Sequence, residues 1–195
     1  MTQQRNFWMR WRVRVGYPVA VVYWVLAAPT PRSILLGSVI AALGLMVRAA
    51  ASGHLRKYEE LCTTGPYART RNPLYLGSAL LAAGFIVAGR SWWGAATVAV
   101  YFALFYYAVM RNEESDLRAR YGPAFEEYAA RVPLFFPRLR VSAPSPAEKG
   151  QSQVSARSFS WQQYTRNREY RALIGAFAGI GILWLRMWLR GRYGY

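Results

Sequence analysis

Apolar residues are concentrated in five runs, separated by short polar or basic segments. The four strong runs cover about residues 13–28, 33–51, 73–88 and 93–110, and a weaker run covers about 172–189. Each is near the roughly 17 to 25 residues that a helix needs to cross the hydrocarbon core of a bilayer. The pattern predicts an all-α fold, a polytopic transmembrane helical bundle of about five membrane helices. Arg186 interrupts the fifth run, which is expected either to span with a snorkelling side chain or to lie in the interface.

The segments between the runs indicate how the helices are connected. Pro29-Thr30-Pro31 ends the first run, and the run at 33–51 is rich in glycine and alanine, which allow close contacts between helices. The segment at 90–94 is a short turn that carries an interfacial tryptophan pair. We therefore expect the third and fourth runs to form a hairpin.

Composition agrees with a membrane protein. The 195 residues are 54% hydrophobic and 16% aromatic, and their formal net charge is +16. The basic residues, almost all arginines, lie between the apolar runs, a pattern that favours lipid headgroups over nucleic acid. The single cysteine, Cys62, excludes an internal disulfide, and with one histidine, His54, the sequence predicts no metal site.

Charge also predicts orientation and domain organisation. Four arginines, at positions 5, 10, 12 and 14, lie before or at the very start of the first run. The positive-inside rule therefore places the N-terminus in the cytoplasm and predicts an inner-membrane protein with a cytoplasmic active site. The arginines that follow the fifth run conflict with this rule if that run spans. We expect a membrane core at 1–140, a flexible linker at 141–160 rich in Ser, Pro, Ala and Gln, and a basic C-terminal segment at 161–195.

The first polar cluster lies where the third run begins. Asn72 is a good N-cap and Pro73 suits the first helical position, so free N–H groups and the positive end of the helix dipole are expected near Arg71. Such a helix start can bind an anion, or it can simply begin a membrane helix with Arg71 at lipid phosphates. Gly77, beside Tyr75, is expected to leave room for a ligand.

The second polar cluster follows the fourth run. Glu113 and Glu114 are carboxylates at a membrane border, where partners are expected. They can bind a cationic ligand, accept hydrogen bonds from ribose hydroxyls, or pair with Arg111 and Arg118.

Two further segments follow this carboxylate pair. We expect a short amphipathic helix, interrupted at Gly122-Pro123, with an apolar stripe formed by Leu117, Tyr121, Phe125 and Tyr128. After it, residues 132–137 are expected to run extended, because prolines do not fit a helix interior, and to cover a pocket formed by the two clusters.

These motifs occur in an order that resembles a known family. In sequence they are Gly65-Pro66-Tyr67, then Arg71-Asn72-Pro73-Leu74-Tyr75-Leu76-Gly77, an apolar hairpin, Glu113-Glu114 with Leu117, Tyr121-Gly122 with Phe125 and Tyr128, and Val132-Pro133 with Pro137. Over about residues 52–138 the chain resembles the isoprenylcysteine carboxyl methyltransferase family and its relatives among phospholipid methyltransferases. The order and spacing of the motifs together carry the resemblance.

The resemblance implies an integral membrane enzyme that takes S-adenosylmethionine from the cytosol and a lipidic acceptor from the bilayer. The cofactor-binding residues it implies are Glu59, Glu60, Leu61, Cys62, Tyr67, Asn72, Pro73, Leu74, Tyr75 and Glu113. Arg71, Tyr75 and Glu114 are the catalytic candidates.

The sequence departs from the family pattern at two positions. Asn72 stands where the family has a histidine, so this position offers no titratable base, and Val109 stands where the prenylcysteine enzymes hold the substrate carboxylate with an arginine. Arg111 is the candidate to replace that arginine. Since a carboxylate needs no base before it is methylated, we expect a lipidic carboxylate or another pre-ionised acceptor.

Other functions stay open at this point. They are a phospholipid amine N-methyltransferase, a membrane reductase whose NADPH phosphates would be bound by Arg69, Arg71 and Arg111, and a non-catalytic membrane scaffold. The sequence does not indicate an oligomeric state.

Overall fold

The computed structural model describes residues 2–56, 60–138 and 159–193, and all regular structure in these ranges is helical. The long helices are α1 (Thr2–Leu26), α2 (Pro31–His54), α3 (Pro73–Gly89), α4 (Trp92–Tyr121) and α8 (Tyr170–Tyr193). The short ones are η1 (Gly65–Ala68), α5 (Pro123–Arg131) and α7 (Trp161–Arg166). The expected linker at 141–160 lies outside the described residues except for its last two positions.

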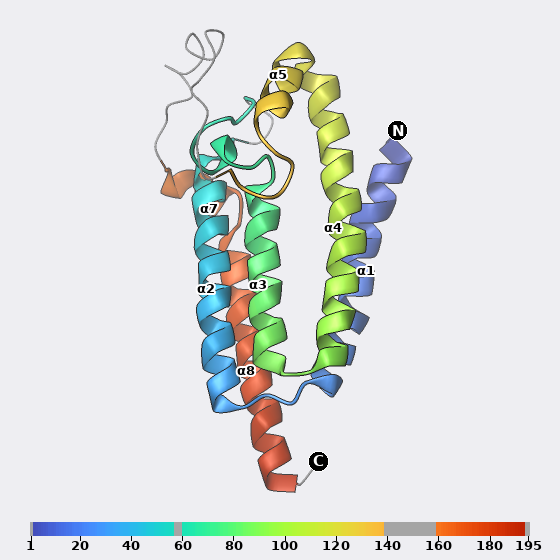
Figure 1. The fold of residues 1–195 in the computed structure, drawn as a ribbon, viewed down its shortest axis with the longest axis vertical. Coiled ribbons are helices and arrows are strands. Elements are labelled where there is room, and N and C mark those ends of the chain that lie inside the picture. The colour runs from blue at the N-terminus through green and yellow to red at the C-terminus, as the bar shows by residue number, and fades with distance from the viewer. Residues whose placement is uncertain (1, 57–59, 139–158, 194–195) are drawn as a thin grey trace.

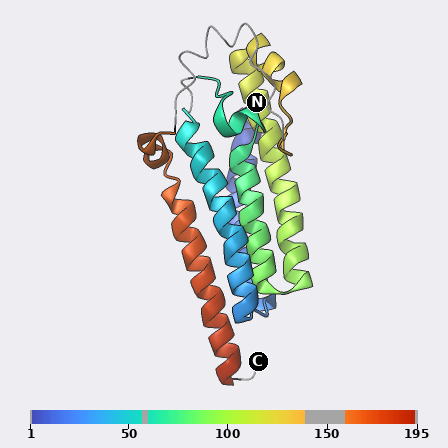
Figure 2. The same ribbon diagram turned by 60° about the vertical axis from the view of Figure 1, so that its left-hand side comes forward.

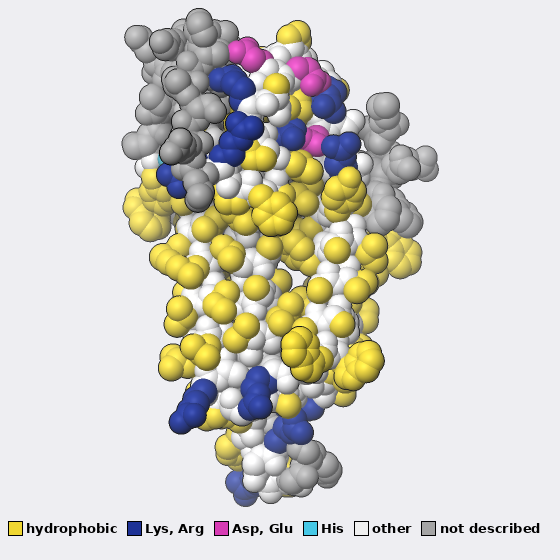
Figure 3. Space-filling view, viewed as in Figure 1, with side chains coloured by type: hydrophobic (Ala, Val, Ile, Leu, Met, Phe, Trp, Pro, Cys, Tyr) yellow, Lys and Arg dark blue, Asp and Glu magenta, His cyan; other side chains and the backbone are white. Residues whose placement is uncertain are grey.

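The five long helices stand side by side as a bundle. α2 packs on α3, α1 packs on α4, and α8 lies along the outside of α2 and α3 (Figures 1 and 2). By length and composition α2, α4 and α8 can each cross a membrane, and Arg14–Leu26 and Pro73–Gly89 are shorter apolar helices. Figure 3 shows apolar side chains across the middle of one face of the bundle and arginines near both ends of that face. The predicted polytopic helical bundle is confirmed.

Two helices are longer than the sequence pattern predicted. α1 begins at Thr2, well before the apolar run at 13–28, and α4 continues past Met110 to Tyr121. Hydropathy marks only the part of a helix that fits in lipid, whereas the helix itself continues until a breaker such as Gly122, which has a φ of 49°. The apolar stripe expected after residue 114, with its interruption at Gly122-Pro123, is divided between α4 and α5 at that point.

Glycines hold α2 and α3 together at two levels. A Cβ atom added to Gly44 would lie 2.6 Å from the carbonyl oxygen of Gly77, and one added to Gly84 would lie 2.6 Å from that of Gly37. Such approaches are open only to glycine. A Cβ at Gly77 would also lie 2.5 Å from Cγ of Arg48. The expectation that Gly77 leaves room for a ligand was thus wrong, since α2 fills that space.

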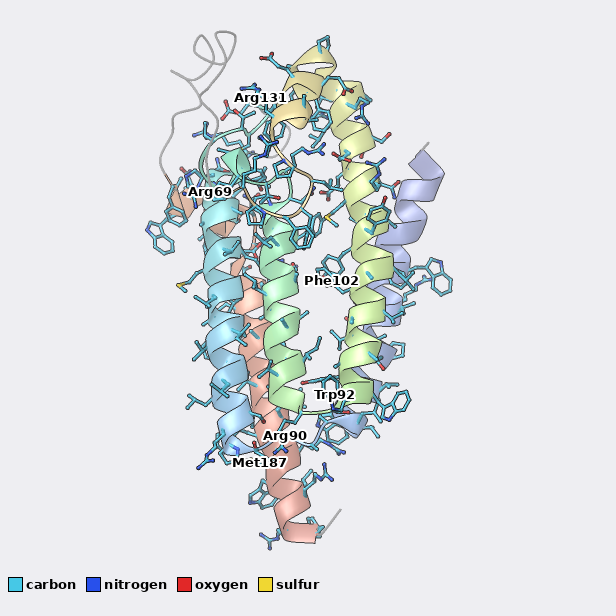
Figure 4. All side chains as sticks on the ribbon, in the orientation of Figure 1. Arg69, Arg90, Trp92, Phe102, Arg131 and Met187 are labelled. Atoms are coloured by element: carbon cyan, nitrogen blue, oxygen red, sulfur yellow. The ribbon has the colours of Figure 1, made fainter. Side chains whose placement is uncertain are left out.

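Arg186 lies at the end of the bundle away from α5, where it binds the last turn of α1. Its Nε donates to the carbonyl of Ala27 over 2.8 Å, and its Nη2 donates to that of Val25. Its guanidinium also lies over the ring of Trp24, 5.0 Å from the centroid. Figure 4 shows the neighbouring Met187 at the same end as Arg90. Arg186 therefore marks one end of the α8 apolar segment.

Candidate active site

The candidate site lies at the end of the bundle where α3 begins. The segment at 132–138 lies against the turn that precedes α3, because Arg71 N–H donates to the carbonyl of Pro133 over 2.9 Å and Arg138 N–H donates to that of Arg69 over 3.0 Å. Figure 4 places Arg69 and Arg131 at this end. The segment therefore lies against the first polar cluster, and its role as the cover of a pocket formed by both clusters stays a prediction.

Side chains complete this contact. The buried hydroxyl of Thr70 donates to the carbonyl of Phe135 over 2.9 Å, and Asn72 Nδ2 donates to that of Leu134 over 3.0 Å. Asn72 occupies the N-cap position of α3, but its side chain accepts no capping hydrogen bond. The prediction of a side-chain cap was wrong because the 132–138 segment offers the Asn72 amide a carbonyl partner.

Glu114 lies between two arginines. Arg71 Nη1 donates to its Oε1, and Arg111 Nη1 donates to its Oε2 over 2.9 Å. Glu114 is only 3% exposed, so this carboxylate is removed from water and needs both partners. Of the alternatives left open for the two carboxylates, pairing with Arg111 is present at Glu114, whereas Arg118 binds Glu126 on the surface.

Arg71 has one buried donor without a partner among the described residues. Its Nε is buried and has no hydrogen-bond partner within the described part of the chain. A buried guanidinium donor without a partner costs free energy, and an anionic ligand would remove that cost.

Glu113, the other carboxylate, contacts the first turn of α3. The Tyr75 hydroxyl donates to its Oε1 over 2.6 Å. The ring of Tyr106 meets that of Tyr75 edge-on with centroids 5.5 Å apart, and Phe102 stacks on Tyr106 at 4.0 Å. Figure 4 shows Phe102 on α4. An aromatic series thus leads from the membrane part of α4 to the Tyr75–Glu113 pair.

The other cofactor candidates lie on the side of η1 and α5. Leu61 packs against the core of Phe125, Tyr128 and Val132, and the Cys62 thiol donates to the carbonyl of His54 over 3.5 Å. Burial raises the pKa of Cys62 to about 11. Oε1 of Glu60 lies 3.7 Å from Nε of Arg56. Glu59 lies outside the described residues.

Tyr67 joins this side to the carboxylate cluster. It is buried in η1, and its carbonyl accepts a hydrogen bond from the Tyr128 hydroxyl over 2.7 Å. Burial raises the pKa of its phenol well above the usual value, and the charge of Glu113 is among the smaller causes. The structure therefore brings Tyr67, Arg71, Tyr75, Glu113 and Glu114 to one end of the bundle.

Sequence reasoning missed two charged residues close to this site. Arg48, in the C-terminal part of the apolar helix α2, donates to the carbonyl of Leu74 on α3 over 3.4 Å, and it pairs with Glu169. A lone arginine within an apolar run is a signal that could have found it, because such a charge requires a partner. Within the described ranges, no group of three or more His, Cys, Asp or Glu side chains could hold a metal ion.

Comparison with known proteins gives two curated relatives. The chain is 35% identical over 138 residues to the cobalt-zinc-cadmium resistance protein CzcN of Cupriavidus metallidurans. The aligned residues make up 67% of this chain and 63% of the relative. It is 45% identical over 86 residues to the nickel-cobalt-cadmium resistance protein NccN of Alcaligenes xylosoxydans xylosoxydans, covering 44% of this chain and 40% of the relative. The chain thus spans less than two thirds of the length of either. No solved structure matches it significantly.

A family comparison identifies the core of the chain. The sequence model of the phospholipid methyltransferase family matches residues 32–124, which run from α2 to the start of α5. The matched part contains Arg71, Tyr75, Glu113 and Glu114. Residues 32–124 therefore form a domain of the phospholipid methyltransferase family, a family of integral membrane methyltransferases that includes isoprenylcysteine carboxyl methyltransferase-like proteins.

Proposed function

We propose that this protein transfers a methyl group from S-adenosylmethionine to a lipidic acceptor at the cytoplasmic face of the inner membrane. The observation that carries the proposal is the charged cluster around Glu114, beside the Tyr75–Glu113 pair, at one end of apolar helices in a methyltransferase domain. In this proposal residues 1–140 form the catalytic core, 141–160 a linker and 161–195 a separate C-terminal segment.

The residues present fit the charges of this cofactor. Its methionine part carries a carboxylate, for which Arg71 offers the buried Nε without a partner. Its ammonium and ribose hydroxyls are donors, for which Glu113 offers a carboxylate. Tyr67, Leu61 and Cys62 would line the side of η1. When bound, the cofactor would supply a methyl group that its sulfonium already activates.

The protein would contribute mainly orientation. Well-oriented reactants save about 7 to 11 kcal/mol of the barrier through proximity. Both oxygens of Glu114 accept from guanidinium groups, so we assign it the role of holding Arg71 and Arg111 in place rather than that of a general base. Tyr75 and Glu113 then stand as the polar pair nearest to the reacting groups.

Arg111 supports a negatively charged acceptor. Its side chain is 57% exposed although it is bound to Glu114. It can therefore meet a headgroup from the bilayer while its charge stays in place. Val109 is buried at 4% exposure and presents no charge. We propose that Arg111 binds the carboxylate of a lipidic acceptor and that the aromatic residues Tyr106 and Phe102 lie along its apolar part.

The test is a labelling experiment with the full chain in lipid nanodiscs. Methyl-labelled S-adenosylmethionine is added with an extract of bacterial lipids, and the labelled product is identified by mass spectrometry. We expect a methyl ester that releases labelled methanol in base, and loss of product for Arg111→Leu. A labelled amine headgroup would instead favour the phospholipid N-methyltransferase reading. Binding of NADPH without binding of S-adenosylmethionine or S-adenosylhomocysteine would contradict methyl transfer.

A further inference from the structure

A mostly buried ion pair joins α2 to the start of α8. Arg48 Nε lies 2.5 Å from Glu169 Oε1, and the two side chains are 21% and 10% exposed. Glu169 lies beyond the matched domain at 32–124 and is not used by the proposed chemistry. A buried charge without its partner is strongly destabilising, so each residue requires the other.

The same Arg48 side chain also binds the first turns of α3. Its Nη1 donates to the carbonyl of Leu74 over 3.4 Å and to the hydroxyl of Ser78. Its aliphatic part lies against Gly77, where a Cβ atom would come within 2.5 Å of Cγ. Leu74 directly precedes Tyr75, so the guanidinium binds the same helical turn that presents the Tyr75 hydroxyl to Glu113.

Glu169 is itself fixed by the segment that precedes α8. Asn167 Nδ2 donates to the carbonyls of Ser52 and Leu55 over 2.9 and 3.0 Å, at the last turn of α2. Ser160 N–H donates to the carbonyl of Gly53 over 3.1 Å, and the Phe159 ring lies where a Cβ atom of Gly53 would be. These contacts hold the segment at 159–169 on the end of α2.

We propose that Glu169 is a positioning residue of the candidate site. Through Arg48 it holds the first turns of α3 in the orientation in which Tyr75 meets Glu113. The C-terminal segment, outside the methyltransferase domain, thereby becomes necessary for full cofactor affinity. This inference rests on the proposed function for its cofactor, whereas its structural part, the order of the first α3 turns, does not.

The structural part is tested by hydrogen–deuterium exchange on the full chain in nanodiscs. The variants are Glu169→Gln, Arg48→Met and their combination, and the matched control is Glu126→Gln, which breaks the exposed pair with Arg118. Relative to the wild type, we expect faster exchange confined to residues 73–78 in the first three proteins. The control should exchange at the wild-type rate. Unchanged exchange at 73–78, or faster exchange spread evenly over all helices, would overturn the proposal.

Cofactor affinity is then measured by titration with S-adenosylhomocysteine. Glu169→Gln and Arg48→Met should each weaken binding about three- to tenfold, and the double variant no further than the worse single one. Glu169→Asp, which keeps the charge, should recover most of the affinity. Wild-type affinity in folded Glu169→Gln would refute the positioning role. A wild type that does not bind, with localised exchange in Glu169→Gln, would refute the proposed function and leave the structural part in place.

Discussion

The Tyr75 hydroxyl donates a 2.6 Å hydrogen bond to Glu113, and this contact joins α3 to α4 at the end of the bundle that carries the site. The two residues are 38 positions apart in the chain. α3 packs chiefly on α2, and this hydrogen bond is a polar link to α4, which α3 also meets at the Tyr75–Tyr106 ring contact and at the hairpin turn.

Removing either partner of this link should weaken cofactor binding. We expect Tyr75→Phe and Glu113→Gln each to lower the affinity for S-adenosylhomocysteine about tenfold. The first variant loses the charge-assisted hydrogen bond that holds Glu113, and the second removes the carboxylate that would accept hydrogen bonds from the ligand. Glu127→Gln is the matched control, since Glu127 pairs only with Arg131 among the contacts described and lies on the surface of α5. Calorimetric titration measures the change, and unaltered affinity in both site variants would contradict the assignment of the cofactor site.

The glycine contacts between α2 and α3 should be sensitive to a single methyl group. In a helix an alanine is more favourable than a glycine by roughly 0.5–1 kcal/mol. Gly181→Ala on α8 should therefore raise stability, because no atom outside the helix's own nearby backbone would lie within 4 Å of the added Cβ atom. Gly84→Ala should lower it, because the new Cβ meets the carbonyl of Gly37 at 2.6 Å. Thermal unfolding in detergent should shift in opposite directions for the two variants. A rise in the unfolding temperature of both variants would contradict this, because it would mean that α2 and α3 can move apart at Gly84 without cost.

Cys62 should react slowly as long as the protein is folded. Burial raises the pKa of its thiol to about 11, so little thiolate is present at pH 8. Iodoacetamide labelling should be slow at pH 8, accelerate above about pH 10, and become fast in denaturant. Because the folded pKa lies above the unfolded one, the proton stabilises the fold below about pH 9, and this contribution is lost as the pH rises toward 11. Fast labelling of the folded protein at pH 8 would show that the thiol is exposed.

The C-terminus should lie on the opposite side of the membrane from the candidate site. α8 runs from the site end to the far end of the bundle (Figure 1), and it is long and apolar enough to span. Alkaline phosphatase fused to the C-terminus should therefore be active in the periplasm, and a green fluorescent protein fused there should be dark. A fluorescent fusion would place α8 in the interface and contradict five spans.

The sequence predicted the parts of the fold that depend on local pattern. Apolar runs located the membrane helices, since bilayer thickness sets their length regardless of tertiary contacts. Glu113, Tyr75 and Arg71 were identified from motifs, and the structure brings them to one end. How they act there remains a prediction.

Contacts between distant segments were not predictable in the same way. The pairing of Arg48 with Glu169 joins positions 121 residues apart, and no periodicity links them. The Asn72 side chain had two kinds of partner available, a helix N–H group or a distant carbonyl, and packing of the 132–138 segment decided between them. The space beside Gly77 was likewise decided by α2 rather than by its own helix.

The hydrogen bonds from Arg186 to the carbonyls at the end of α1 have a consequence for biosynthesis. Arg186 and Ala27 are 159 residues apart, so α2, α3 and α4 must all be synthesised before that contact can form. Until then the C-terminal end of α1 relies on its neighbours within the membrane, and the nascent chain carries an unfinished bundle. Completion of the bundle therefore waits until α8 has been synthesised, after the residues of the candidate site.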